Sequence, residues 1–312
     1  MTKVTYQGVI GCFSHAVCER VFPQAVHRGC LSFGDAMRSV STGEADIAVI
    51  PVENSVAGRV MEVYNMLPDI DLFIIGEYFM PIHHCLMMPT RFVRGLPPQN
   101  LNEDELLEWK RRKPSEDELK DALSRILEVR SHSHGLAQCQ KFLMKNLPNA
   151  RLREMWDTAG AARDLAQKPV AGVAVLAPKE AVRYGMTILA ENVEDTSNNT
   201  TRFLFLRKKP LDAADIPGKA LTSLVFQTKN VAGALVTVLD VFRRHNINMT
   251  KLETYMTGTH HEQPVFYVDL EMNRFTNEGV QTLDEVKTVS TGIQVLGTYP
   301  VSPSRSETAP AG

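Results

Sequence analysis

Short apolar runs and helical stretches alternate through roughly the first two thirds of the chain. An apolar segment at 4–8 is followed by a glycine turn and by helical spacing at 16–22. Helical spacing returns at 33–42 and precedes a continuous apolar run at 45–52. Strand-length apolar runs that alternate with amphipathic helices are typical of α/β proteins with buried strands. The hydrophobic pattern therefore predicts an α/β fold for this part of the chain.

A different order of elements follows the segment 209–219, which contains two prolines and one glycine. The apolar pattern then predicts, in order, a strand at 221–228, a helix from 232, strands at 247–255 and 266–272, a helix at 279–289 and a strand at 293–299. This βαββαβ order is the ferredoxin-like arrangement. We therefore expect two folded units, at 3–208 and 220–300, joined by 209–219 as a linker. The tail at 301–312 is polar and contains proline, and we expect it to be disordered.

Charged side chains crowd the segment at about 91–122. Within it, Ser115 and Glu118 have the spacing of a capping box, which predicts the start of a helix. Charged helix faces are common on protein surfaces. We interpret the segment as an insertion of two solvated helices in the first unit.

Three polar clusters stand at the ends of predicted elements. Residues 198–202 are small polar residues and an arginine, directly before an apolar run. Glu53, Asn54 and Ser55 end the apolar run at 45–52, and a cluster at 131–134 precedes a helix. Ligands of open α/β sheets gather at the carboxyl ends of strands, so we expect the fold to bring these clusters together. As isolated residues, the same side chains are also typical helix caps.

Three predicted helices begin with hydroxyl or carboxylate side chains. Ser14 precedes the first, Ser131 or Ser133 precedes another, and Asp157 and Thr158 open an alanine-rich third helix. Such side chains cap helices, and the free N–H groups of a helix start attract anions. If the fold places them in one cleft, they would hold an anionic small molecule.

Composition narrows the class of protein. The chain has 312 residues and a net charge of −2, which argues against broad nucleic-acid binding. No apolar run approaches the roughly 20 residues of a membrane helix, and the N-terminus has no signal-peptide pattern. We therefore expect a cytoplasmic protein that binds neither nucleic acid nor membrane. The five cysteines have no C-x-x-C spacing, so we predict neither a disulfide framework nor a metal site.

Two motifs identify a family resemblance. Asn199–Phe203 and Pro51–Ser55 match, in order and spacing, the motifs of prephenate dehydratase with a C-terminal ACT regulatory domain, which the chain resembles over residues 3–300 apart from the charged segment. Supporting matches are Gly8–Ser14, Ser131-His132, Ala137–Cys139, Thr158–Ala162 and Tyr184-Gly185. The resemblance implies a catalytic domain with two lobes around a cleft, like a periplasmic binding protein. It also implies the loss of carbon dioxide and hydroxide from prephenate, which gives phenylpyruvate on the route to L-phenylalanine, without a metal or organic cofactor.

The family's catalytic threonine corresponds to Thr201. The polar clusters and the resemblance together predict substrate contacts from Ser14, Glu53, Asn54, Ser55, Ser131, Thr158, Asn199, Arg202 and Phe203. Arg202 has two possible roles. Because side chains alternate along a strand, Thr201 and Phe203 share one face and Arg202 lies on the other. Arg202 either binds the pyruvyl carboxylate or braces the cleft through a carboxylate such as Glu53.

The second unit resembles a phenylalanine sensor. Gly233, Ala234, Leu235 and Val236 match the first effector-binding motif of the family. The second motif, usually Glu-Ser-Arg-Pro, here starts with Glu253 and Thr254 and continues with tyrosine and methionine, which weakens the expectation that phenylalanine binds. The family implies a homodimer or homotetramer.

Other functions fit parts of this pattern. Arogenate dehydratase acts on a substrate that carries an amine where prephenate has a keto group. A prephenate decarboxylase would retain the hydroxyl, and a non-catalytic amino-acid sensor would only report ligand binding.

One residue departs from the family near the first turn, where Cys12 stands at a position that is often threonine or serine.

Overall fold

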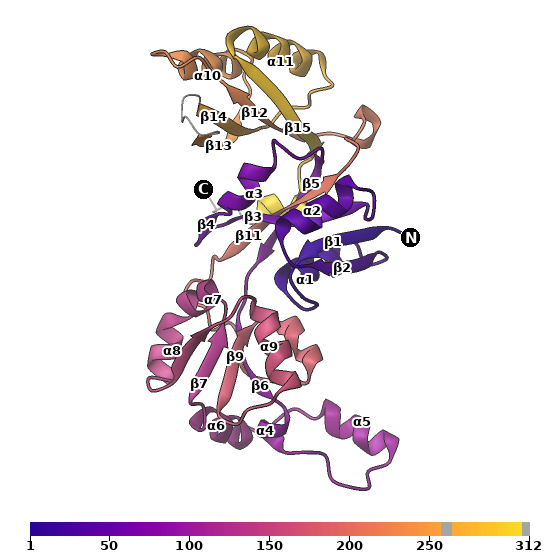
Figure 1. Ribbon diagram of the computed structural model, residues 1–312, viewed down its shortest axis with the longest axis vertical. Helices are drawn as coiled ribbons and strands as arrows, with labels where there is room; N and C mark the ends of the chain where they lie inside the picture. The colour runs from indigo at the N-terminus through magenta and orange to yellow at the C-terminus, as the bar shows by residue number, and fades with distance from the viewer. Residues whose placement is uncertain (257–263, 308–312) are drawn as a thin grey trace.

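The computed structural model describes residues 1–256 and 264–307 of the chain. Two α/β lobes and a C-terminal unit follow one another along the long axis of the molecule (Figure 1). The first lobe lies between the other two parts and contacts both. The predicted fold class, a two-lobed α/β arrangement followed by a βαββαβ unit, is confirmed.

The first lobe is built on a sheet with the strand order β2-β1-β3-β11-β5. Its strands are β1 (Lys3–Gln7), β2 (Val26–Cys30), β3 (Ile47–Asn54), β4 (Gly58–Arg59, paired with β3), β5 (Phe73–Pro81) and β11 (Thr200–Arg207). Its helices are α1 (Phe13–Val21), α2 (Phe33–Ser41) and α3 (Met61–Met66). The strand β3 is an apolar run because helices cover both faces of the sheet, which buries residues 47–50 completely or nearly so.

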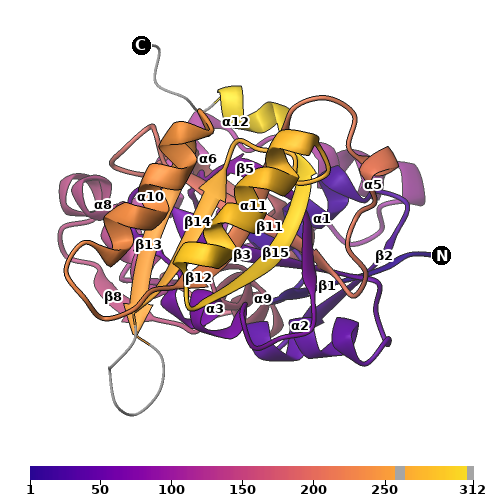
Figure 2. The same ribbon diagram turned by 90° about the horizontal axis from the view of Figure 1, so that it is seen from above.

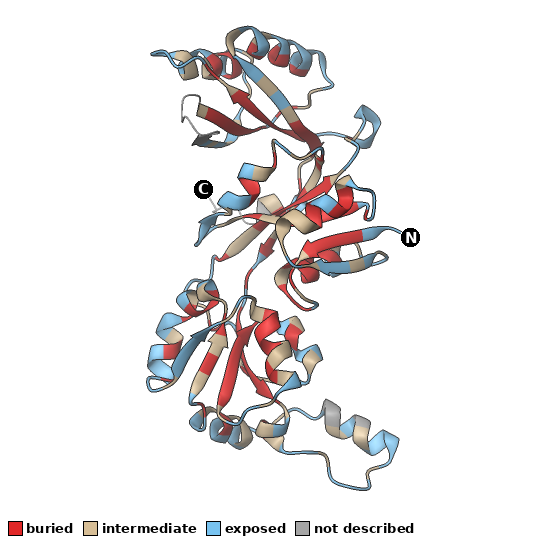
Figure 3. Cartoon of the chain, viewed as in Figure 1, coloured by how far each residue is buried: buried red, intermediate tan, exposed pale blue. Residues whose placement is uncertain are grey.

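The second lobe has the strand order β10-β6-β9-β7-β8. Its strands are β6 (Cys85–Pro89), β7 (Glu128–Ser131), β8 (Arg151–Glu154), β9 (Val173–Ala177) and β10 (Met186–Ala190). Its helices are α4 (Arg91–Arg94), α5 (Glu103–Arg111), α6 (Glu116–Ser124), α7 (Ser133–Gln138), α8 (Gln140–Asn146), α9 (Thr158–Gln167) and a 3-10 helix (Lys179–Tyr184). Ser115 and Glu118 form the predicted capping box at the start of α6. Figure 3 shows that α5 projects from the lobe, and none of the α5 residues whose burial is described is buried.

The chain crosses between the lobes twice. Residues 82–84 lead from β5 into β6, and residues 191–199 return from β10 to β11. The two crossings are joined where the Ile82 N–H donates to the Asn199 carbonyl at 2.8 Å. The motif that begins at Asn199 therefore starts at the junction of the lobes.

The C-terminal unit is an antiparallel sheet with the order β13-β14-β12-β15. Its elements are β12 (Ala220–Gln227), α10 (Ala234–Arg244), β13 (Met249–Met256), β14 (Pro264–Leu270), α11 (Asn277–Val289) and β15 (Gly292–Pro300); a short 3-10 helix, Ala213–Asp215, precedes them. Both helices cover one face of the sheet (Figure 2). The other face packs on the first lobe, where Tyr267 and Tyr299 share a core with Tyr64 and Ile74. Gly297 lies so close to the Ile74 carbonyl that a side chain at position 297 would clash with it.

The tail differs from its predicted disorder. Residues Pro303–Glu307 form helix α12, which lies against β5. The Ser304 hydroxyl accepts a hydrogen bond from the Phe79 N–H at 2.9 Å, and Arg305 pairs with Glu77 at 2.8 Å. The tail is ordered here because β5 supplies partners for its polar side chains, and these partners cannot be inferred from the sequence of the tail. Residues 308–312 lie outside the described part of the chain. Among the described residues, no helix is long and apolar enough to cross a bilayer.

Candidate active site

A cavity of about 410 Å³ lies between the two lobes. The first lobe contributes Ser14, Asn54, Thr201 and Phe203 to its lining, and the second contributes Thr158. Thr201 was predicted to be catalytic, and the other four were predicted to contact the substrate. The fold thus brings together residues that lie up to about two thirds of the chain apart, because β3 and β11 are neighbouring strands.

The hydroxyl of Thr201 is oriented by Asn54, which lies directly opposite on β3. The Asn54 side-chain oxygen accepts the N–H groups of Val56 at 3.0 Å and Ala57 at 2.7 Å. These two donors fix the orientation of the amide, so its nitrogen faces Thr201 and donates to Oγ1 at 2.9 Å. Thr201 is therefore an acceptor in this contact, and its own hydrogen is available to donate into the cavity.

Two further predicted residues support this pair from behind. The Asn199 side-chain oxygen accepts a hydrogen bond from Asn54 Nδ2 at 2.6 Å, and Asn199 itself is buried. The Ser55 hydroxyl donates to the Asn198 carbonyl at 2.8 Å and accepts the Thr200 N–H at 2.9 Å. Ser55 and Asn199 hold the start of β11 in place and are absent from the residues that line the cavity.

A β-bulge separates Arg202 from Phe203. Arg202 pairs with Glu53 on β3, whereas Phe203 pairs with Pro51, so one residue of β3 is extra. Bulges often lie next to active sites, where they redirect side chains. Thr201 and Phe203 line the cavity, and Arg202 points to the opposite side of the sheet, as the alternation predicted.

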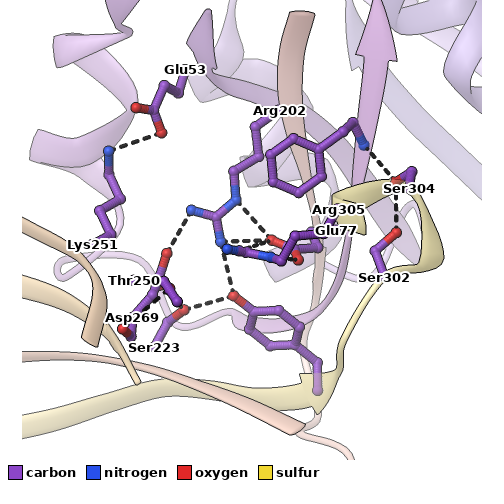
Figure 4. A network of polar contacts seen from close by, with 12 residues as sticks. Glu53, Glu77, Arg202, Ser223, Thr250, Lys251, Asp269, Ser302, Ser304 and Arg305 are labelled. Atoms are coloured by element: carbon purple, nitrogen blue, oxygen red, sulfur yellow. Dashed lines mark hydrogen bonds and ion pairs between the residues drawn. The ribbon is translucent and has the colours of Figure 1, made fainter. Parts of the chain in front are cut away.

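Arg202 does not face the cavity, which corrects the prediction that it contacts substrate. Its guanidinium pairs with Glu77 at 2.8 Å and with Asp269 of β14 at 2.5 Å, and it donates to the Tyr299 hydroxyl at 3.1 Å (Figure 4). The Asp269 carboxylate also accepts hydrogen bonds from Ser223 and Tyr267. Arg202 therefore has the bracing role, but its partners are buried acids of β5 and β14.

Glu53 also lies outside the cavity lining. Its carboxylate pairs with the Lys251 ammonium of β13 at 2.9 Å (Figure 4). Lys251 pairs in turn with Glu253, and Glu253 pairs with Arg59 of β4. The prediction of a substrate contact for Glu53 is thus corrected, because the C-terminal unit covers this side of β3 and supplies the opposite charge.

The two helices α1 and α9 begin at the cavity. Ser14 is buried and lines the cavity. The prediction that Ser14 caps α1 is wrong. The cap is Cys12, whose sulfur accepts the His15 N–H at 3.5 Å. Burial raises the pKa of the Cys12 thiol to about 12, so the thiol is neutral at physiological pH. Asp157 caps α9 as predicted, and Thr158 is the first residue of that helix.

Ser131 has a structural position. Its hydroxyl is fully buried and donates to the Leu176 carbonyl at 2.8 Å. The cap of α7 is His132. The prediction that Ser131 binds substrate or caps this helix is therefore corrected, because β9 provides a nearer acceptor inside the lobe.

The sequence reasoning missed several cavity residues, chiefly His84 and Gln138. His84 is buried, and its Nε2 lies 2.9 Å from the Gln138 side-chain oxygen. Burial lowers the pKa of His84, so the ring is neutral at pH 7. Its position in the crossing from β5 to β6 could have been found only from the topology. Among the described residues, no cluster of histidine, cysteine and acidic side chains is suited to a metal ion.

The predicted effector motifs lie in the C-terminal unit. Gly233 caps α10 with a positive φ of 82°, and Ala234, Leu235 and Val236 form the first turn of that helix. Val236 is two thirds exposed. Glu253 and Thr254 lie on β13, where Arg59 of the first lobe contacts the Glu253 carboxylate and the Thr254 carbonyl. The second motif therefore touches the catalytic part of the chain directly.

Comparison with known proteins places this site in a family. The family model of prephenate dehydratase matches residues 4–211, which covers both lobes. The chain belongs to the prephenate dehydratase family. Arogenate dehydratase 3 of Arabidopsis thaliana is 32% identical over 98% of this chain and 70% of that protein. The bifunctional chorismate mutase/prephenate dehydratase of Escherichia coli K12 is 31% identical over 96% of this chain and 70% of that protein.

Solved structures resemble this family member over almost its whole length. A structure described as a novel type of quorum-quenching acylase has a TM-score of 0.79 and 28% identity, and the match covers 97% of this chain and 99% of that one. A prephenate dehydratase from Arthrobacter aurescens, in complex with L-Phe, has a TM-score of 0.79 and 24% identity, and the match covers 100% of this chain and 92% of that one. The second match shows that the fold, including the C-terminal unit, is shared.

Proposed function

We propose that this prephenate dehydratase family member converts prephenate to phenylpyruvate in the cleft between the lobes, and that Thr201 assists the departure of the hydroxyl. The observation that carries this proposal is the direction of one hydrogen bond. Asn54 donates to Thr201 Oγ1, so the Thr201 hydrogen is free for a group in the cavity. A group that donates a hydrogen bond where negative charge develops stabilises the transition state.

The reaction balances with these groups alone. The bond from C1 of the ring to its carboxylate breaks and releases carbon dioxide, and its electron pair enters the ring. The bond from C4 to oxygen breaks, the ring becomes aromatic, and the oxygen leaves as hydroxide. Thr201 donates to this oxygen as its charge grows, and one proton from solvent completes the water. Because the hydroxyl of threonine has a high pKa, its part is a hydrogen bond that strengthens in the transition state, with no full transfer required.

The two carboxylates of prephenate need different treatment. A strong ion pair with the departing carboxylate would stabilise the ground state more than the transition state. The cavity is consistent with this requirement, since its described lining contains no lysine or arginine. The pyruvyl carboxylate can be bound by backbone N–H groups at the starts of α1 and α9, which lie at the cavity. Ser14 and Thr158 provide hydroxyls beside these helix starts.

The experiment is a measurement of phenylpyruvate formation from prephenate by absorbance. The purified protein is expected to show saturable turnover without added metal or cofactor. Tight binding of prephenate without turnover would favour a non-catalytic sensor. Formation of a decarboxylated product that keeps the hydroxyl would favour a decarboxylase.

We further propose that the C-terminal unit is an ACT regulatory domain that responds to L-phenylalanine and that the protein forms a homodimer or homotetramer. Support comes from the βαββαβ fold, from the Gly233–Val236 turn at the start of α10, and from the ion pair that joins Glu253 to Arg59 of the first lobe. Titration of the activity with phenylalanine tests the regulation, and sedimentation measures the assembly. No response up to millimolar phenylalanine would show that the altered second motif has lost the effector.

A further inference from the structure

The cavity contains one acid that the proposed reaction of prephenate does not use. Among the described residues that line it, Asp157 is the only acid, and lysine and arginine are absent. The three histidines that line it include His84 and His132, and burial lowers the pKa of both, which leaves them neutral at pH 7. A neighbouring hollow that shares His134 and Gln138 adds Lys141, but it also adds two acids, Glu194 and Asp195. Prephenate has no positive charge that this acid could bind, so Asp157 is unexplained by prephenate alone.

Asp157 has one carboxylate oxygen in use by the helix and one directed across the cleft. Oδ1 accepts the Gly160 N–H at 2.5 Å and caps α9. Oδ2 faces the opposite lobe, because a Cβ built on Gly8, at the end of β1, would lie 3.1 Å from it. Among the ion pairs of the described residues, none involves Asp157, although Arg163 acts on it from a greater distance. Burial raises the pKa of this carboxyl, so a cation in the cavity would remove a cost that the free protein bears.

Arogenate offers the matching charge. It has the ring, the hydroxyl and both carboxylates of prephenate, but its side chain carries an ammonium group in place of the keto oxygen. When the C4 hydroxyl lies at Thr201, this side chain lies at the other end of the ring. Backbone N–H groups at a helix start can bind the amino-acid carboxylate there, and a neighbouring aspartate can bind the ammonium.

We propose that Asp157 is the residue that sets the preference of the cleft between prephenate and arogenate, because its carboxylate binds the arogenate ammonium. This inference rests on the proposed function, because it uses the same cleft and the same chemistry at Thr201. The reaction of arogenate breaks the same two bonds and yields carbon dioxide, water and L-phenylalanine. Asp157 takes no part in bond breaking, so its effect lies in substrate selection.

Asp157→Asn isolates the charge from the cap. Asparagine caps helices about as well as aspartate, so α9 should be retained. The amide oxygen would keep the bond to Gly160, which places the amide nitrogen at the present position of Oδ2, toward Gly8 of the opposite lobe. An N–H group at that point can donate to the keto oxygen of prephenate but repels an ammonium. We therefore expect kcat/KM for arogenate to fall about 10- to 100-fold, while kcat/KM for prephenate rises, because the variant replaces a negative charge beside a dianion with a donor.

The experiment measures initial rates with both substrates, as phenylpyruvate absorbance for prephenate and as chromatographically quantified phenylalanine for arogenate. Asp157→Ser is a second neutral cap and should shift the preference in the same direction. Asp164→Asn makes the same chemical change on the same helix, outside the described cavity lining, and should alter neither rate. Thermal unfolding checks that each variant folds.

Each other outcome overturns the proposal. An equal loss with both substrates in Asp157→Asn would show that Asp157 acts through the helix alone. Prephenate turnover by the wild type without arogenate turnover would refute the inference and leave the proposed function intact. If the wild type converts neither substrate, the proposed function fails and the inference fails with it.

Discussion

Asn54→Asp tests the direction of the hydrogen bond on which Thr201 depends. The substitution preserves shape, and the carboxylate can still accept the N–H groups of Val56 and Ala57. Its second oxygen then faces Thr201 as an acceptor where the wild type has a donor. Thr201 would give its hydrogen to this carboxylate and lose it for the substrate. Asn199 can adapt, because its buried Nδ2 has no partner among the described residues and could donate to the new oxygen.

The expected size of the effect follows from the loss of one donor to a developing anion. Such losses cost about 2.7–4 kcal/mol, or about 10²- to 10³-fold in kcat. Asn54→Ala removes the donor to Thr201 without adding an acceptor, so its kcat should fall less, by roughly fivefold, which corresponds to about 1 kcal/mol of transition-state stabilisation. The more conservative change in shape is therefore expected to be the more damaging one.

The assay is the rate of phenylpyruvate formation as a function of pH. As the pH falls through the pKa of the introduced carboxyl, protonation restores a donor toward Thr201, so the relative activity of Asn54→Asp should rise. The wild type provides the reference profile. If Asn54→Asp were as active as Asn54→Ala, or more active at neutral pH, the assigned direction of the hydrogen bond would be wrong.

The buried ion pairs between the first lobe and the C-terminal unit lead to three further predictions. Arg202→Met should reduce the free energy of unfolding by about 3–5 kcal/mol in urea titration, because it leaves Asp269 buried without its cation; a loss below about 1 kcal/mol would contradict this. Burial alone would raise the pKa of Asp269, but Arg202 holds this pKa below its ordinary value. The ionised Asp269 therefore adds to the free energy of unfolding above about pH 4, and this contribution should be lost as the pH falls through the depressed pKa. In urea titrations at several pH values, Asp269→Asn should show a smaller loss of stability in acid than the wild type. Arg305→Met should reduce the free energy of unfolding by about 1–3 kcal/mol, because Glu77 keeps its ion pair with Arg202. The double variant Arg202→Met/Arg305→Met should lose more than the sum of the two single losses, since Glu77 then has neither cation. Strictly additive losses would argue against this shared network.

The sequence predicted the fold class and the core of the cleft. Apolar runs and helical spacing indicate buried strands and covering helices, and strand ends then bring Asn54 and Thr201 together. The alternation along β11 also predicted that Arg202 faces away from Thr201 and Phe203. These inferences succeeded because they depend on local periodicity and on the geometry of a sheet.

The errors concern partners supplied by distant segments. Glu53 and Arg202 resembled substrate ligands because the acids and the lysine that neutralise them lie in β5, β13 and β14. Ser14 and Ser131 were assigned as caps by residue preference, but Cys12 and His132 occupy those positions. Asp157 was predicted as a cap, and only the three-dimensional cavity shows that its second oxygen faces the opposite lobe.

The most direct test of the account is prephenate turnover by Thr201→Val, which preserves the shape of the side chain and removes its hydroxyl. The account predicts that the wild type forms phenylpyruvate, and that the variant loses about 10²- to 10⁴-fold in kcat while it still binds prephenate. Thr201→Ser, which keeps the hydroxyl, should retain much more activity than Thr201→Val. A Thr201→Val variant that turns over prephenate within about threefold of the wild-type rate would contradict the role of Thr201.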